Sequence, residues 1–94
     1  MNIELKKFGT MLVSRPGGRE AWLAAQAYVL PQQATQEEIV VDFQGVDVLS
    51  PSWADEFISK LVERFGGDRV QFVHTENASV KATLKTLNLQ IENF

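Results

Sequence analysis

Two serines, Ser50 and Ser52, carry the hydroxyls of this chain that are best placed for chemistry. They flank Pro51, which is favoured in the first turn of a helix, so both hydroxyls are expected at a helix N-terminus. Backbone N–H groups and the helix dipole favour negative charge at that position. The pattern therefore suits a phosphorylatable serine, an anion contact or a helix cap.

Two carboxylates follow the serines at the start of the same expected helix. Asp55 and Glu56 would each stabilise a first turn by about 0.3–1 kcal/mol, and they would equally suit contact with a partner. A phosphate on Ser52 would be favoured by the helix N-terminus but repelled by Asp55, one turn later on the same face. The sequence therefore leaves two roles open for this acidic pair, which are stabilisation of the helix start and contact with a partner.

Other reactive side chains could suggest hydrolysis, metal binding or phosphate binding, but the motifs typical of these sites are missing. Ser52, His74 and Asp42 would form a hydrolytic triad only if they met at one edge of a sheet, and the chain has no Gly-x-Ser-x-Gly elbow. One histidine and no cysteine leave no pattern for a metal site, and we expect no cofactor. Arg15 precedes a Pro-Gly-Gly turn that lacks the spacing of a phosphate-binding loop.

Composition limits the class of protein. Ninety-four residues with 45% hydrophobic content fit one domain, 1–94. Nine basic against 12 acidic residues, a net charge of −3, argue against a nucleic-acid partner. No apolar stretch approaches the roughly 20 residues that span a bilayer, and the first residues lack the apolar region of a signal peptide. We expect a cytoplasmic protein without a membrane partner.

The elements around the serines predict an α/β fold. Residues 39–43 are a continuous apolar run, typical of a central parallel strand that is covered on both faces. Residues 51–65 place their apolar side chains on one helical face, and Gly66 and Gly67 then stop the helix. The segment 46–52 between them is predicted to be an exposed loop.

The remaining segments complete the predicted order. Residues 3–8 and 10–14 are predicted to form a hairpin around Gly9, and residues 16–18 to break the chain before a helix over 19–30. A strand over 69–73 and a helix capped by Asn77 and running to about Leu87 follow. The tail 88–94 suits an edge strand, an irregular tail or a contact with another molecule. This predicts a mostly parallel sheet of four to five strands with an N-terminal hairpin and about three helices.

Two motifs in this order carry a resemblance to a known family. Residues 41–46, Val-Asp-Phe-Gln-Gly-Val, and residues 50–57, Ser-Pro-Ser-Trp-Ala-Asp-Glu-Phe, resemble the STAS-like domains of unknown function, relatives of the anti-sigma-factor antagonists. Phe8-Gly9-Thr10 and Ser14-Arg15 are similar to the N-terminal hairpin of the family and the arginine after it. The resemblance covers about residues 8–87.

The resemblance implies a non-catalytic domain that binds a signalling protein. Better-studied relatives bind a protein kinase or anti-sigma factor, and phosphorylation of a serine or threonine near this helix start releases them. Ser52 is then the first candidate phosphoacceptor and Ser50 the second, because Pro51 stands where another hydroxyl is usual. The implied contact surface for a kinase-like ATPase or other protein partner comprises Arg15, Val48, Trp53, Asp55, Glu56 and Ser59. The alternative is a small-molecule or nucleotide sensor that uses the crevice at the strand ends.

Overall fold

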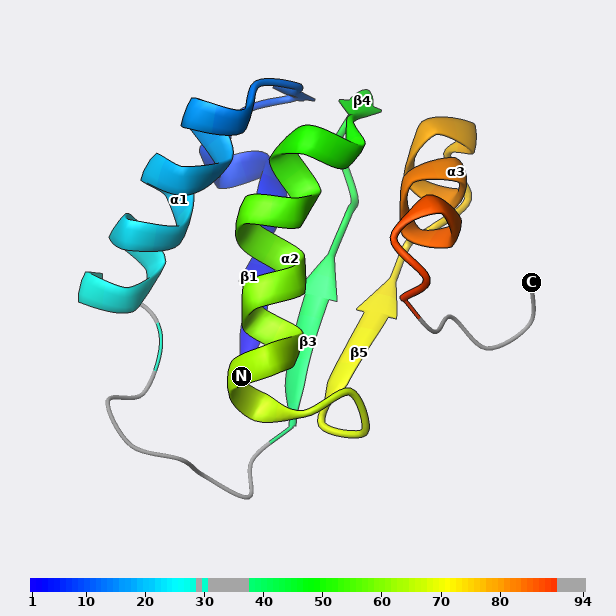
Figure 1. Cartoon of the computed structure of the whole chain (residues 1–94). Helices are drawn as coiled ribbons and strands as arrows, with labels where there is room; N and C mark the ends of the chain where they lie inside the picture. The colour runs from blue at the N-terminus through cyan, green and yellow to red at the C-terminus, as the bar shows by residue number, and fades with distance from the viewer. Residues whose placement is uncertain (29, 31–37, 90–94) are drawn as a thin grey trace.

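The computed structural model describes residues 1–28, 30 and 38–89, and in this part of the chain short parallel strands are overlaid by helices (Figure 1). The elements in chain order are β1 (Asn2–Glu4), the 3-10 helix η1 (Leu5–Phe8), β2 (Met11–Leu12), α1 (Arg15–Tyr28), β3 (Ile39–Asp42), β4 (Val48–Leu49), α2 (Pro51–Phe65), β5 (Val70–Val73) and α3 (Ala78–Thr86).

The strands form two small sheets, both parallel. The larger has the order β1-β3-β5, with Ile3 opposite Val41 and Val41 opposite Phe72. The smaller pairs β2 with β4, and Met11 lies opposite Val48. The α/β class and the central place of β3 agree with the sequence analysis. The prediction of one sheet is wrong, because the described strands divide between two.

The predicted N-terminal hairpin is also wrong. After β1 the chain forms η1, which buries Leu5 completely, and then passes Gly9 at φ 128°. Only glycine reaches that backbone region readily, so Gly9 does turn the chain. The turn sends β2 to pair with β4 instead of returning it along β1. Parallel pairing with β3 buries Ile3, whereas a hairpin would leave β1 and β2 together at one edge.

Helix α1 begins four residues earlier than predicted, at Arg15, so residues 16–18 do not break the chain. Proline in a first turn lacks an N–H that would be unpaired in any case, and the Ser14 hydroxyl accepts a hydrogen bond from the N–H of Gly17 at 3.0 Å. Gly18 is buried against α2. Trp22 and Leu30 in the predicted range 19–30 are buried, whereas Leu23 and Ala27 are exposed.

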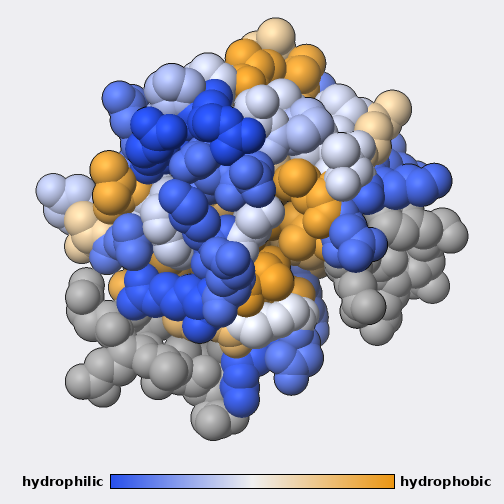
Figure 2. Space-filling model, viewed as in Figure 1, coloured by the Kyte–Doolittle hydropathy of each residue, from blue (hydrophilic) through white to orange (hydrophobic). Residues whose placement is uncertain are grey.

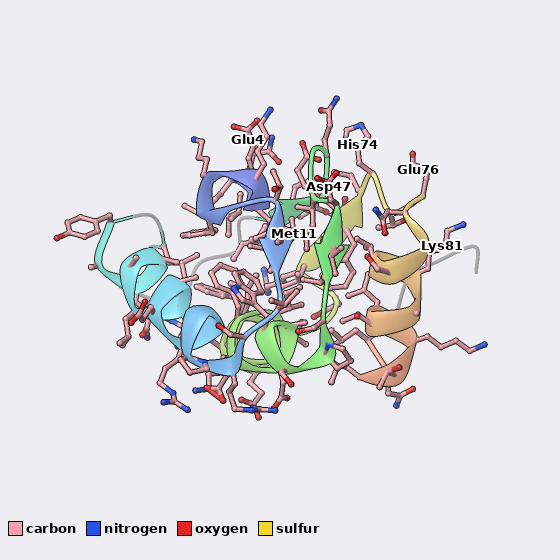
Figure 3. The ribbon with its side chains drawn as sticks, turned by 90° about the horizontal axis from the view of Figure 1, so that it is seen from above. Glu4, Met11, Asp47, His74, Glu76 and Lys81 are labelled. Carbon is pink, nitrogen blue, oxygen red and sulfur yellow. The ribbon has the colours of Figure 1, made fainter. Side chains whose placement is uncertain are left out.

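Helix α2 is the centre of the core, and its predicted bounds are confirmed. Its side chains Phe57, Ile58 and Leu61 are fully buried. Figures 1 and 3 place the three described helices on one face of the β1-β3-β5 sheet. On its other face Val40 is half-buried, so among the described residues helices cover β3 on one side only and not on both as predicted.

The C-terminal elements follow the prediction closely. Strand β5 spans Val70–Val73, and the Asn77 side chain caps α3 by accepting from the N–H groups of Ser79 and Val80. Leu89 packs against the core after the helix ends. The rest of the predicted tail, residues 90–94, lies outside the described residues.

Candidate functional site

Ser50 is the N-cap of α2, and both hydrogen-bonding capacities of its hydroxyl are used. The Oγ accepts from the N–H of Trp53 at 3.2 Å and donates to the carbonyl of Val13 at 2.7 Å. The first bond satisfies a helix N–H that has no partner within the helix, and the second joins α2 to the chain just after β2. A phosphate on Ser50 would break the contact with Val13, which makes Ser50 the less suitable acceptor.

Ser52 lies in the first turn of α2 and is half-buried. Within residues 1–28, 30 and 38–89, no hydrogen bond is recorded for its hydroxyl. Asp55, Glu56 and Ser59 follow at helical spacings of three or four, which places them on the same side of the helix. Four of the residues that the sequence singled out therefore share one stripe of α2.

Arg15 joins this stripe from α1. Its guanidinium Nη1 lies 3.0 Å from Asp55 Oδ2 and 2.9 Å from Glu56 Oε2, although the residues are 40 and 41 positions apart. Arg19 and Lys60 also contact Glu56, with N–O distances of 3.5 and 3.1 Å to its Oε1. Figure 2 shows hydrophilic side chains gathered over the starts of α1 and α2. The result is an ion network across the junction of the two helices.

The network shifts the charge equilibria of its members. Hydrogen bonds from Lys60 and then Arg15 lower the pKa of Glu56, and the charges of Lys60 and Arg19 act in the same direction. Hydrogen bonds to Asp55 and then Glu56 raise the pKa of Arg15. Arg19 and Lys60 were not among the residues predicted from the sequence. Their spacing, four residues after Arg15 and Glu56, was the signal that could have identified them.

Two residues of the predicted contact surface lie apart from this network. Trp53 is only 3% exposed, and its ring stacks on Phe57 with centroids 5.1 Å apart, so it is a core residue with little area to offer a partner. Val48 is half-buried in β4 and belongs to the β2-β4 sheet. The structure therefore brings together Arg15, Ser52, Asp55, Glu56 and Ser59. Trp53 and Val48 are not part of this group.

Asp42 and His74 meet where β3 and β5 end. His74 Nδ1 lies 2.7 Å from Asp42 Oδ1, which also accepts from the N–H of Gln44 at 2.9 Å. The hydrogen bond from Gln44, followed by that from His74, lowers the pKa of Asp42 despite its burial. Among the described residues no hydrogen bond joins Ser52 to His74, so two members of the imagined triad meet without the third. Figure 3 shows His74 projecting away from α2.

Metal sites and membrane-spanning helices are both absent from the described ranges 1–28, 30 and 38–89. No group of three or more His, Cys, Asp or Glu side chains there could hold a metal ion. None of the helices in those ranges is long and apolar enough to cross a membrane.

Comparison with known protein families gives a match. A family model described as a STAS-like domain of unknown function matches residues 27–89, which include β3, β4, α2, β5 and α3. No curated protein and no solved structure matches the chain. Residues 1–26, which supply Arg15 and most of α1, lie outside the matched part.

Proposed function

Because the chain belongs to the STAS-like domains of unknown function, we propose that it is a cytoplasmic, non-catalytic regulatory domain that docks on a kinase-like ATPase or another signalling protein. The surface that docks is the junction of α1 and α2, formed by Arg15, Asp55 and Ser59, whereas Glu56 is buried and contributes by holding Arg15. Phosphorylation of Ser52 weakens this docking. The supporting observation is that Arg15 holds both carboxylates one turn after the Ser52 hydroxyl, which makes no hydrogen bond to the described part of the chain.

The charge arrangement gives the switch a physical basis. A phosphate carries about −1.5 to −2 charges and three acceptor oxygens, so on Ser52 it competes with Asp55 and Glu56 for Arg15. Either Arg15 leaves the carboxylates or the phosphate repels them, and in both cases the charge presented to a partner changes. A partner that fits the unmodified network would then lose complementary contacts.

The alternative, a receptor for a small molecule or nucleotide, has less support. It requires a concave site with converging polar groups at the strand ends. A pocket in the described chain lies between β2 and α1 and is lined mainly by apolar side chains, with Ser14 and Glu20 as its polar ones. The exposed charges of the α1–α2 junction favour docking of a protein.

Affinity capture of the tagged chain from its native cells, followed by mass spectrometry, tests this proposal because it detects a partner and a phosphoserine together. We expect an ATPase to be recovered with wild type and with Ser52→Ala, and at least about tenfold less with Ser52→Asp, equivalent to about 1.4 kcal/mol. Asp55→Lys should also reduce recovery. Glu76→Lys makes the same charge change at an exposed position between β5 and α3, outside the junction, and serves as the control. Unchanged recovery with both Ser52→Asp and Asp55→Lys would exclude this surface.

A further inference from the structure

Within the described residues, strand β2 pairs with β4 along one edge and has no strand along the other. The carbonyls of Thr10 and Leu12 accept hydrogen bonds from β4 and the residues beside it, at 2.8–3.1 Å. Met11 lies between them, and alternate residues of a parallel strand direct their main-chain groups to opposite sides. The N–H and carbonyl of Met11 therefore point away from β4. In the described part of the chain no third strand joins this sheet.

A groove runs along this open edge toward α1. Its volume is about 360 Å³, and its walls include Phe8, Met11, Val13, Ala24 and Trp53. Met11 and Val13 are 60% and 45% exposed, which is unusual for large apolar side chains. They alternate with Leu12, which is buried, so both stand on the solvent side of the strand. Figure 3 shows Met11 on β2 at the surface nearest the viewer.

One carboxylate lies in the wall of this groove. Glu20 of α1 is exposed, and within residues 1–28, 30 and 38–89 no ion pair is recorded for it. A ligand that fits this arrangement has apolar side chains for the groove, main-chain groups for Met11 and a positive charge for Glu20. A second copy of the chain fits less well, because it would bring another Glu20 and its own net charge of −3.

We propose that the open edge of β2 binds an extended, apolar segment of a partner protein that carries a basic residue, which adds to β2 as a strand. Main-chain hydrogen bonds to Met11 provide the alignment, and alternate side chains enter the groove beside Val13. The carbonyl of Val13 is already held by Ser50, so pairing ends there. This surface is separate from the α1–α2 junction, and all but one of its residues lie in the part of the chain that the family model does not match.

A synthetic peptide of about six residues that alternates valine and lysine is the probe. We expect it to shift the amide NMR signals of Met11 and Val13 and the indole signal of Trp53 in the whole chain, with a Kd below about 1 mM. Blocking alternate peptide N–H groups by methylation should abolish binding, because it removes the main-chain donors. Replacing lysine by glutamate, or Glu20→Lys in the protein, should weaken binding about three- to tenfold.

Matched variants locate the site. Val13→Ser should weaken binding, whereas Leu23→Ser, at an exposed apolar residue outside the groove, should not. Asp55→Lys should also leave peptide binding unchanged, which separates this surface from the proposed function. No shift at millimolar peptide, binding that survives methylation, or signals of Met11 that depend on protein concentration without peptide would each overturn the proposal. The last result would indicate self-association through β2.

Discussion

Arg15 and Glu56 form an ion pair of 2.9 Å although they are 41 positions apart in the sequence. The pair joins the first residue of α1 to the second turn of α2, and Arg19 and Lys60 contact the same carboxylate. Glu56 is largely buried, so three cations surround a charge that water reaches poorly. These ion pairs hold the starts of α1 and α2 next to each other and also determine the charge that the two helices present to solvent.

Glu56→Gln should lower the stability of the fold in a pH-dependent way. The cations lower the folded pKa of Glu56 below its ordinary value of 4.5, so its ionised form stabilises the fold above that value. This contribution is lost as the pH falls through the folded pKa. Urea unfolding should therefore show wild type more stable than Glu56→Gln at pH about 7, and a difference that shrinks toward zero at pH about 2.

Glu63→Gln is the control for this comparison, because Glu63 is an exposed glutamate on the same helix. Its difference from wild type should be small at every pH. Asp42 also has a lowered pKa, but it is present in all three proteins and cancels. A difference between wild type and Glu56→Gln that stays constant with pH would show that packing of the side chain, and not its charge, is what matters.

Gly18→Ala should destabilise the chain even though alanine favours helices. A Cβ at Gly18 would collide with the carbonyl oxygen of Trp53 and lie 3.0 Å from its Cα, and backbone atoms cannot move aside as side chains do. We expect a loss of about 1–3 kcal/mol from overpacking, reduced by up to about 1 kcal/mol of helix propensity. Urea unfolding measures it. Gly67→Ala, whose Cβ would meet only Val62 at 3.8 Å, should stay within about 0.5 kcal/mol of wild type.

The parts of the fold that the sequence predicted best are those whose local signals agree with their tertiary surroundings. Helix α2 has an N-cap at Ser50, a proline in its first turn and one continuous apolar face, and all three indicate the same bounds. Strand β3 lies between β1 and β5 and buries Ile39 and Val41, as its apolar run indicates. For these elements local propensity and packing favour one structure, so a single sequence suffices.

The failures occurred where a distant contact determines the outcome. Gly17 and Gly18 predict an interruption of the chain before the helix. Gly18 instead lies within α1, because α2 approaches so closely there that no side chain fits. Residues around Gly9 read as a hairpin, but the partners of β1 and β2 lie more than 30 positions away. Arg15 was identified as a site residue, whereas its pairing with Asp55 and Glu56 depends on how the two helices meet. Local patterns carry no information on such pairings.

His74→Gly should be more stable than His74→Ala by about 1 kcal/mol, the reverse of the usual order. His74 has φ 56°, where a Cβ is strained and glycine is not. Both changes remove the hydrogen bond to Asp42, so their difference isolates the backbone term. Urea unfolding measures it. Glu76 is exposed and has no positive φ, so its alanine variant should be at least as stable as its glycine variant. The same order at both positions would contradict a strained backbone at His74.

Ser50→Ala should destabilise the fold by about 1–3 kcal/mol, because one hydroxyl makes two bonds. Its loss leaves the N–H of Trp53 without a cap and the carbonyl of Val13 without a donor. Ser50→Asp separates the two effects, since a carboxylate caps the helix but cannot donate to Val13. If the cap dominates, Ser50→Asp recovers most of the loss in urea unfolding. If the link to Val13 dominates, Ser50→Asp is no more stable than Ser50→Ala, and the amide signals of Met11 and Val13 shift in both variants.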